Sequence, residues 1–503
     1  MHLIVVLAVF AALGAAEAVR QPGGALWGES LRPSTALAMV AGTMMLIWTL
    51  LRWRSRHVLA RLERQDETSL RRGLRLAARS EILGRWLITA AYVGQLTIGG
   101  WARLVEVQWQ MWRWWLADEA VLLVPFVLML LAHWNCHYPV NRRVREWIMM
   151  GQLAEGLAAR PVWSRRQYLS FQVRSGLGIV LVPLSVIVGI RDLSEWLART
   201  WLPHTGPWVA ELATVAGAGL VFLFGPLLLR RVWVTTPLPT GPLREKLETF
   251  CRRIKLGYRE ILLWRTHSAV ANAAVMGLLP QVRFVLLSDA VIEQVGDEQI
   301  EAIFGHEAGH VKHHHLLYLG MLILGGGSFA VLLGKGVCQL LVWAVYRTVG
   351  DPDQAQALLG TWDDLIMCGG LAFTMVAAVL VFGWISRRLE HQADIYAARA
   401  VAGQLHPPGR DEQLDPHGAW AMGTALVRLA LLNGMPIESR SWRHPSIASR
   451  ASFLRDLSDT PGGLWRYHRR LWWMKLAIFV MLVLGTAGSA VLYWLSLRAQ
   501  AGA

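Results

Sequence analysis

The sequence contains little cysteine and little charge. Its four cysteines, Cys136, Cys251, Cys338 and Cys368, are scattered and form no C-x-x-C pair, which argues against a disulfide framework and against a cysteine-based metal site. Only 17% of the 503 residues are charged, 54% are hydrophobic and the mean hydropathy is +0.36. A soluble globular chain is rarely so apolar, so the composition predicts a polytopic membrane protein.

Acidic residues are the scarcer of the two charged classes. The chain has 35 Asp and Glu against 50 Lys and Arg, a net charge of +15. A basic chain can indicate nucleic-acid binding, but these arginines are clustered in stretches between apolar runs, as in positive-inside loops. We therefore expect a lipid bilayer, and no nucleic acid, as a partner of this chain.

Apolar runs divide the chain into five parts. The region 1–229 is expected to hold about six spans, although the first run (3–19) is compatible with either a cleaved signal or a retained span. Two polar regions, 230–315 and 386–470, are separated by two spans within 316–385, and a last span with a short tail occupies 471–503. The six N-terminal runs are 3–19, 35–51, 86–101, 118–134, 175–190 and 209–229.

The arginine-rich stretches indicate how these spans are oriented. When the spans alternate from an inside N-terminus, the basic stretches 52–85 and 136–174 fall on one side, the cytoplasmic side. The polar regions 230–315 and 386–470 fall on that side as well. We therefore expect an integral, multi-pass protein of a bacterial inner membrane, with both polar regions at the cytoplasmic face. The loop 348–364 is acidic and is expected outside.

The polar regions have a mixed local pattern. Residues 243–254 have helical periodicity, whereas 260–264 and 282–287 are short apolar runs typical of strands. Asp297 is expected to cap a helix that runs on into the span 316–345. The predicted fold class is therefore mainly α, a polytopic helical membrane protein with a small α+β domain at the cytoplasmic face.

The most informative motif is H-E-x-x-H at 306–310. On a helix, His306 and His310 lie one above the other on the same face, so both imidazoles can bind one zinc ion. Glu307 can then accept the proton of a metal-bound water. The histidine run at 313–315 is interpreted as a solvated, interfacial face. Two ligands do not make a catalytic site, so the hypothesis requires a third.

Glu390 is the candidate third ligand, because it follows the next span on the same predicted side. A helix through 390–394 would place Glu390 and Asp394 on one face. Glu390 would complete a His-His-Glu site with a fourth position open for water, and Asp394 would accept a hydrogen bond from a ligand imidazole. The alternative is an exposed acidic pair that neutralises nearby arginines. The upstream H-E-x-x-H on the same side favours the ligand.

Four sequence blocks carry a resemblance to a known family. They are Ala271-Asn272-Ala273 with Gly277 and then Leu287-Ser288-Asp289; Asp297 through His310 with Lys312 and His315; Ser386 through Asp394; and His444-Pro445-Ser446 with Arg450. In this order they resemble the integral-membrane zinc metallopeptidases that include the CAAX prenyl protease and the heat-shock protease HtpX, with the pattern HExxH…ExxxD. Residues 1–205 carry no matching motif.

The resemblance implies a zincin-like domain with one Zn²⁺ per chain. It implies that Asn272 lies on an edge strand that pairs with substrate backbone, that His444 stabilises the oxyanion and that Arg450 braces the site. Glu307 would be the general base in the hydrolysis of peptide bonds of membrane-associated or misfolded proteins. Ala274 stands where the family often has an aromatic residue, a departure that bears on substrate preference.

Three alternatives compete with this peptidase hypothesis. A membrane transporter with an incidental H-E-x-x-H is disfavoured, because few ionisable residues lie within the predicted spans. A catalytically inactive, metal-free scaffold is disfavoured because every expected group is present. A site-2 type peptidase would carry its motif inside a span, whereas here the motif precedes one. The sequence predicts no oligomeric state.

Overall fold

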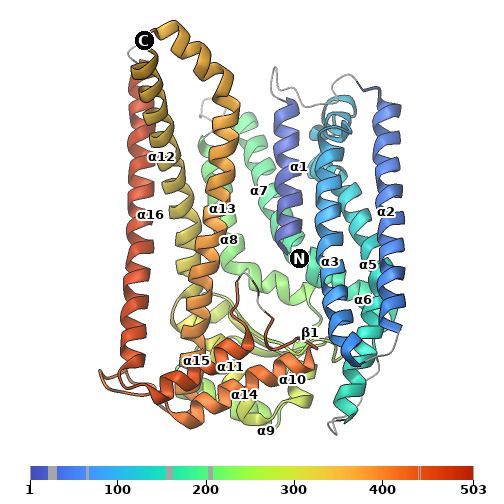
Figure 1. The fold of residues 1–503 in the computed structure, drawn as a ribbon, viewed down its shortest axis with the longest axis vertical. Helices are drawn as coiled ribbons and strands as arrows, with labels where there is room; N and C mark the ends of the chain where they lie inside the picture. The colour runs from blue at the N-terminus through green and yellow to red at the C-terminus, as the bar shows by residue number, and fades with distance from the viewer. Residues whose placement is uncertain are drawn as a thin grey trace.

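The computed structural model describes residues 2–20, 31–63, 67–154, 162–201, 208–439, 441 and 443–501. Long helices form two groups that stand side by side, and a small mixed domain lies at one end of both groups (Figure 1). The N-terminal helices make up the first group, and α12, α13 and α16 make up the second. The small domain is therefore connected to the ends of long helices on both sides.

The N-terminal group is built from six long helices. Its core holds Tyr92, Phe126 and Trp134, all at most 1% exposed, and the Tyr92 hydroxyl donates to the Leu122 carbonyl oxygen at 3.0 Å. The long helices are α1 His2–Arg20, α2 Pro33–Glu63, α3 Glu67–Leu96, α5 Ala117–Ala154, α7 Ile179–Trp201 and α8 Trp208–Val232. Shorter elements join them: α4 Trp101–Arg103, η1 Leu104–Gln108, η2 Met111–Arg113, α6 Arg165–Gln172 and η3 Val173–Gly178.

Seven helical segments in the described part of the chain are long and apolar enough to cross a membrane. They are Leu3–Arg20, Pro33–Glu63, Ala117–Ala154, Arg165–Trp201, Val209–Val232, His315–Gly334 and Gly463–Val491. The span expected at 86–101 is not among them, because α3 begins in the basic stretch and ends at Leu96, before a turn. The span expected at 365–385 lies within α13 Pro352–Val401, and much of it falls on side chains outside those described.

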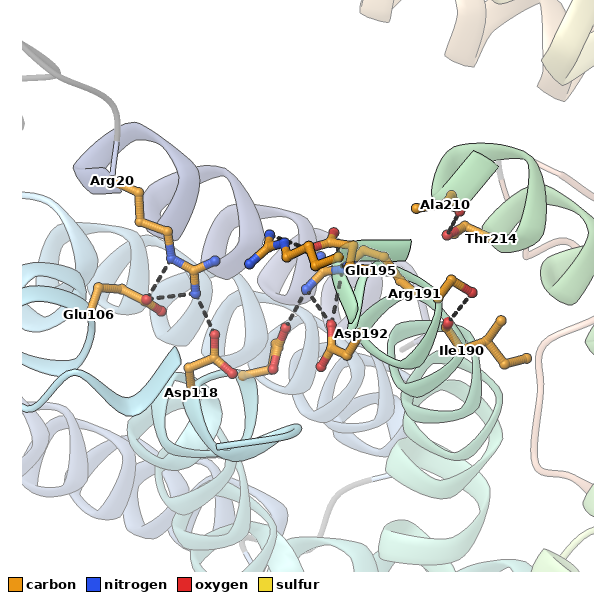
Figure 2. Close-up of polar contacts among 12 residues, drawn as sticks. Arg20, Glu106, Asp118, Ile190, Arg191, Asp192, Glu195, Ala210 and Thr214 are labelled. Carbon is orange, nitrogen blue, oxygen red and sulfur yellow. Dashed lines mark hydrogen bonds and ion pairs between the residues drawn. The ribbon is translucent and has the colours of Figure 1, made fainter. Parts of the chain in front are cut away.

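Paired charges join four elements at the end of the N-terminal group that lies away from the small domain (Figures 1 and 2). Arg20 of α1 donates to Glu106 of η1 at 2.8 Å and to Asp118 of α5 at 2.5 Å. Arg191 of α7 donates to Glu119 of α5 at 3.0 Å. Because the Glu106 side chain is fully buried, its pairing with Arg20 compensates a charge that would otherwise be costly there.

A four-stranded mixed sheet forms the centre of the small domain. Its order is β1-β2-β4-β3, with β2 and β4 parallel and the two outer pairs antiparallel. Within the described ranges, strand β3 therefore has one sheet neighbour and a free edge. The strands are β1 Thr235–Pro237, β2 Glu260–Trp264, β3 Ala273–Met276 and β4 Phe284–Ser288. The helical elements around them are α9 Pro242–Arg253, η4 Pro280–Val282, α10 Asp289–Gln294, α11 Asp297–Lys312, α14 Pro416–Leu432 and α15 Ile447–Asp459.

The sequence predicted part of this domain. The expected helix at 243–254 corresponds to α9, and the expected strands at 260–264 and 282–287 correspond to β2 and β4. Strands β1 and β3 were not expected from periodicity, because three or four residues are too few to show an alternating pattern. The buried core combines Val285 and Leu287 of β4 with Phe304 of α11 and Ile395 of α13.

Two local expectations about the helix that carries H-E-x-x-H were wrong. Asp297 does not cap it: Gly296 has the extended backbone of the N-cap, and Asp297 is the first helical residue. The helix also does not continue into the following span. It ends at Lys312, His314 adopts a left-handed conformation with φ of 54°, and α12 His315–Val349 begins after this break. A left-handed residue cannot continue a right-handed helix, so the chain changes direction here.

The expectation of an acidic loop at 348–364 was also wrong. Helix α12 ends at Val349 and α13 begins at Pro352, so most of this stretch is helical. Asp351 caps α13 by accepting a hydrogen bond from the backbone of Asp353 at 3.0 Å, the usual role of Asp before a first-turn proline. The last long helix, α16 Gly463–Ala501, returns along α12.

Candidate metal centre

Helices α11 and α13 approach closely because small residues face each other between them. A Cβ atom on Gly305 would lie 3.2 Å from the Cα atom of Ala397, and one on Gly309 would lie 3.1 Å from the Cα atom of Ala393. Both distances are tighter than ordinary van der Waals contact, so larger side chains would separate the helices. The close approach brings the histidine face of α11 against the acidic face of α13.

His306, His310 and Glu390 converge at this contact. The Nε2 atoms of the two histidines lie 3.2 Å apart, and each lies 3.7 Å from a Glu390 carboxylate oxygen. All three ligand atoms lie within 4.8 Å of one another. In a tetrahedral site with bonds of about 2.0–2.1 Å, ligand atoms are separated by roughly 3.3–3.5 Å. The three side chains therefore have both the chemistry and the spacing of a zinc site.

Asp394 and Arg450 hold the first imidazole. Nδ1 of His306 lies 2.9 Å from Oδ1 of Asp394, which is fully buried. Arg450 donates to both Asp394 oxygens, at 2.8 and 2.5 Å, so the carboxylate is fixed on its other side. This pairing assigns the proton to Nδ1 of His306 and leaves the lone pair of Nε2 directed at the ligand cluster.

The second imidazole is oriented through two further side chains. Nε2 of His315 lies 3.0 Å from the amide oxygen of Gln392, and Nδ1 of His315 lies 2.8 Å from Nδ1 of His310. An amide oxygen only accepts, so Nε2 of His315 carries the proton and its Nδ1 accepts from His310. Nε2 of His310 is then left as a free lone pair, directed at the same cluster as that of His306.

The expectation that the histidine run 313–315 is a solvated face was wrong for His315, which is 2% exposed. His313 is half-buried and His314 is exposed. The role of Gln392 was not foreseen either. Its contact with His315 crosses the break between α11 and α12, so no helical spacing in the sequence indicates it. The sequence offered one indication of this role, the position of the polar Gln392 between Glu390 and Asp394 on a predicted helix.

Glu390 is enclosed by cationic and polar groups. Its Oε1 lies 3.1 Å from Nδ1 of His444, and its Oε2 lies 3.7 Å from Nη1 of Arg450. Burial by itself would raise the pKa of this carboxyl, but the His444 hydrogen bond and the neighbouring positive charges lower it well below its usual range. With Glu390 at 6% and Asp394 at 0% exposure, the alternative of an exposed acidic pair is excluded.

The protonation of the remaining groups follows from burial and charge. Burial raises the pKa of Glu307, against the opposing effect of His306. For His306, burial opposes the charged form, but the hydrogen bond and charge of Asp394 outweigh it and raise the pKa. For His310, burial and the neighbouring His306 lower the pKa to about 4. Of the two candidate ligand imidazoles, His306 therefore has the higher pKa.

The free edge of β3 borders the site. The Val275 backbone amide stabilises the charged form of Glu307, so β3 runs beside the base candidate. Asn272 directly precedes this strand and has an exposed side chain; its backbone N–H donates to the Ser288 hydroxyl at 3.0 Å, and its carbonyl oxygen accepts from the Ser288 backbone at 2.9 Å. These bonds fix the start of β3 and leave the Asn272 side chain facing solvent.

His444 lies at the open side of the cluster. Its side chain is 47% exposed, and its backbone N–H donates to the Ser441 hydroxyl at 2.8 Å. The structure therefore brings seven of the predicted site residues, all except Asn272, into one network around the His-His-Glu group: Glu307, His444, His306, His310, Glu390, Asp394 and Arg450.

Comparisons with known proteins point to one family. Residues 237–458 match peptidase family M48. A protease HtpX homolog of Bordetella avium is 23% identical over 211 residues, which cover 41% of this chain and 67% of that protein. A CAAX prenyl protease 1 homolog of Oryza sativa is 25% identical over 44% of this chain and 49% of its own length. The corresponding Arabidopsis thaliana protein is 33% identical over 34% of this chain and 40% of its own length.

The matched part is thus about half the length of the plant relatives or less. Among solved structures, the crystal structure of S. mikatae Ste24p aligns with 83% of this chain and 98% of its own, with 14% identity and a TM-score of 0.42. The family match and the named relatives confirm the predicted resemblance to the metallopeptidases that include HtpX and the CAAX prenyl protease.

Proposed function

We propose that this chain, which carries a peptidase M48 region at 237–458, is a zinc-dependent endopeptidase. Its substrates are membrane-associated or misfolded proteins, and it cleaves them at the cytoplasmic face of the membrane. The observation that carries this proposal is the His306–His310–Glu390 group, in which both imidazoles are held with a free Nε2 directed at one point. A histidine pair that only stabilised the fold would not require both Nε2 lone pairs to face the same point.

His306, His310 and Glu390 would hold one zinc ion per chain. Two imidazole nitrogens and one carboxylate are a common catalytic zinc set, with a fourth position left for water or substrate. When bound, zinc polarises the scissile carbonyl and acidifies the attacking water. Asp394 and Gln392, through His315, set the tautomers that this binding requires.

Glu307 is the proposed general base. It neighbours His306 on α11, and the raised pKa of its carboxyl makes it a stronger proton acceptor than an exposed glutamate. In its ionised form it takes the proton of the attacking water and then passes it to the leaving amine. The β3 amide of Val275 keeps the ionised form accessible in a buried setting.

His444 and Arg450 complete the proposed machinery. His444 is half-exposed beside Glu390, where its Nδ1 contacts the carboxylate. Its other ring nitrogen, Nε2, would be the donor to the carbonyl oxygen of the substrate as negative charge develops. Arg450 is 8% exposed and contacts both Asp394 and Glu390, so it positions the ligands without needing to touch substrate. Asp394 acts in the same way through His306.

The free edge of β3 is the proposed substrate-binding element. A substrate in extended conformation would add to this edge as a further strand, with the Asn272 side chain available for a polar contact at its start. The opposite edge of β3 is already paired with β4. Because Val275 lies beside Glu307, a strand added here would pass close to the ligand cluster.

The cytoplasmic location is proposed from charge. The small domain lies at one end of the long helices, the end at which the arginine-rich stretches of the chain gather. Substrates would reach the site from the membrane or its surface, since α11 lies directly before α12, a candidate span, and the third ligand lies directly after the span expected at 365–385. A bacterial inner membrane with the site facing the cytoplasm agrees with this arrangement.

Zinc content and peptide cleavage by the purified full-length protein test the proposal. We expect one zinc per chain in the unmutated protein and in Glu307→Gln, and a large loss of zinc in His306→Ala. Cleavage should fall by about 10²–10⁴-fold in Glu307→Gln, because only the proton acceptor is lost. No zinc in the unmutated protein would favour the transporter or the metal-free scaffold. Bound zinc without cleavage of any membrane protein would leave the metal centre assigned and refute the peptidase activity.

A further inference from the structure

We propose that a basic pocket beside the ligand cluster binds the headgroup of an anionic phospholipid. The pocket has a volume of about 910 Å³ and lies where α13 enters the small domain and α16 leaves it. Part of its wall is the loop that carries His444. The assignment of the ligand does not depend on the proposed peptidase activity, although its effect on cleavage does.

The pocket is separate from the metal cluster on α13. Arg387 and His391 line the pocket and are four residues apart, so they occupy one face of the helix. Glu390 and Asp394 are also four residues apart and face α11. Neighbouring faces of one helix therefore serve the two sites, and His444 is the residue that borders both.

The pocket is cationic. Arg387, Arg388 and Arg470 line it together with His391 and His444, and its described lining contains no Asp or Glu. The guanidinium of Arg388 lies over the Trp384 ring, 3.5 Å from its centroid, and Arg470 is exposed. Guanidinium groups bind phosphate oxygens in pairs of charge-assisted hydrogen bonds. The chemistry therefore selects a phosphate-bearing anion.

The surroundings select a lipid as the source of that phosphate. Trp384, Leu471 and Met474 form an apolar side of the pocket. Next to it, α13 exposes Leu380 (67%) and α16 exposes Trp472 and Trp473 (57% and 60%). Exposed tryptophans beside arginines at the end of a span mark the headgroup level of a bilayer. A phosphate held by the arginines would have its acyl chains along these apolar helix faces.

Occupancy of the pocket would act on Ser441 and on the segment 443–446. Ser441, His444 and Pro445 form part of the wall, so a bound headgroup packs against the segment that places the His444 imidazole beside Glu390. Since the His444 side chain is half-exposed and only its backbone N–H donates to the Ser441 hydroxyl, such packing would restrict the motion of the imidazole. We therefore expect anionic lipid to increase the rate of peptide cleavage.

The test compares lipid binding by three forms of the full-length protein. Native mass spectrometry in detergent would count retained phosphatidylglycerol and phosphatidylcholine on the unmutated protein, on the double variant Arg387→Gln/Arg470→Gln and on Arg469→Gln. Arg469 is the matched control, because it is an exposed neighbour of Arg470 that stacks on Trp465 and does not line the pocket. We expect selective retention of phosphatidylglycerol, lost by about tenfold or more only in the double variant.

Other outcomes would overturn the lipid assignment. Equal retention by all three forms would mean that the net basic charge, and not the pocket, attracts the lipid. Displacement by soluble glycerol phosphate at equal concentration would assign a free phosphate instead, and a higher KM for acidic peptides with unchanged lipid retention would assign a substrate. A photoactivatable phosphatidylglycerol on unmutated protein gives a test free of folding effects: crosslinks should map to 384–391 or 467–474, and crosslinks elsewhere would contradict the proposal.

The effect of the lipid on cleavage is measured separately from lipid retention. In vesicles, added phosphatidylglycerol should raise kcat/KM for a membrane-bound peptide by about fivefold over phosphatidylcholine alone, and the double variant should lose this response. Lipid retention without cleavage would leave the pocket assigned and the peptidase proposal refuted. Cleavage without selective lipid retention would support the peptidase proposal and refute the lipid assignment of the pocket.

Discussion

At the residue scale, the second imidazole of the cluster depends on side chains that bind neither metal nor substrate. His310 is oriented by His315, which is oriented by Gln392. His306 has the same arrangement with a direct carboxylate partner, Asp394. Both devices present a neutral imidazole with Nε2 unprotonated, the state that zinc requires.

Replacing His315 should therefore weaken zinc binding without removing a ligand. We expect His315→Phe to lower zinc affinity by about 10–100-fold, because His310 would lose the partner that fixes its tautomer and ring orientation. Competition with a chromophoric chelator measures this. The control is His314→Asn, since that side chain is exposed and Asn tolerates its left-handed backbone. Equal affinities in both variants would refute the orienting role of His315.

Zinc affinity should also depend on pH with a definite sign. Asp394 raises the pKa of His306, so below that raised pKa protons compete with the metal and affinity falls as pH decreases. His310, with its pKa lowered to about 4, stays neutral at pH 6 and above. We expect the dissociation constant for zinc to rise by up to about tenfold per pH unit as pH falls below the raised pKa of His306. A constant value from pH 8 to 6 would contradict the assignment.

Much of this site could be predicted from the sequence, and part of it could not. Helical spacing alone places His306 with His310 and Glu390 with Asp394, and the structure brings these pairs together. The contact of His315 with Gln392 could not be predicted, because it depends on the left-handed residue that separates α11 from α12. A single backbone angle of this kind leaves no periodic pattern.

At the scale of elements, the contact between α11 and α13 determines whether the ligands meet. Gly309→Ala should separate the two helices, because the new Cβ atom would lie 3.1 Å from backbone of Ala393. We expect a loss of about 1–3 kcal/mol in the free energy of unfolding together with weaker zinc binding. Thermal unfolding in detergent, with and without zinc, measures both.

The matched control is Gly320→Ala in α12, where a Cβ atom would meet nothing within 4 Å. Alanine is favoured over glycine inside a helix, so this variant should be no less stable than the unmutated protein. If Gly309→Ala behaved like Gly320→Ala, the close approach of α11 and α13 would not be what holds the ligands together.

Elements were predicted unevenly, for physical reasons. Helix α9 and strands β2 and β4 have apolar patterns long enough to read, whereas β1 and β3 are too short. The acidic stretch after α12 resembled a loop in composition, yet Pro352 begins a helix there with Asp351 as its cap. Composition therefore did not indicate where α13 begins, because the start of this helix depends on the local capping interaction of Asp351.

At the scale of the whole molecule, the polar network at Arg20 and the ligand cluster lie at opposite ends (Figure 1). Arg20→Met would leave the fully buried Glu106 side chain without its cation. We expect a loss of about 1–3 kcal/mol in stability, less than for a wholly buried pair because Arg20 is 37% exposed. Zinc affinity should not change, since the affected charges are far from the cluster.

Arg199→Met is the control for this prediction. Arg199 is 75% exposed and pairs with Glu195, itself 43% exposed, so its loss should have little effect on stability. Thermal unfolding and zinc titration of both variants would show whether the two ends of the molecule affect stability and zinc affinity independently. A fall in zinc affinity in Arg20→Met would show that the far network and the site are coupled.

The proposed function depends on the binding of one zinc ion per chain by His306, His310 and Glu390. The most direct measurement is anomalous diffraction at the zinc edge from crystals of the full-length protein. We expect one peak per chain, at about 2.0–2.2 Å from Nε2 of both histidines and from a Glu390 oxygen. A peak at other residues, or none at this cluster in zinc-containing crystals, would contradict it.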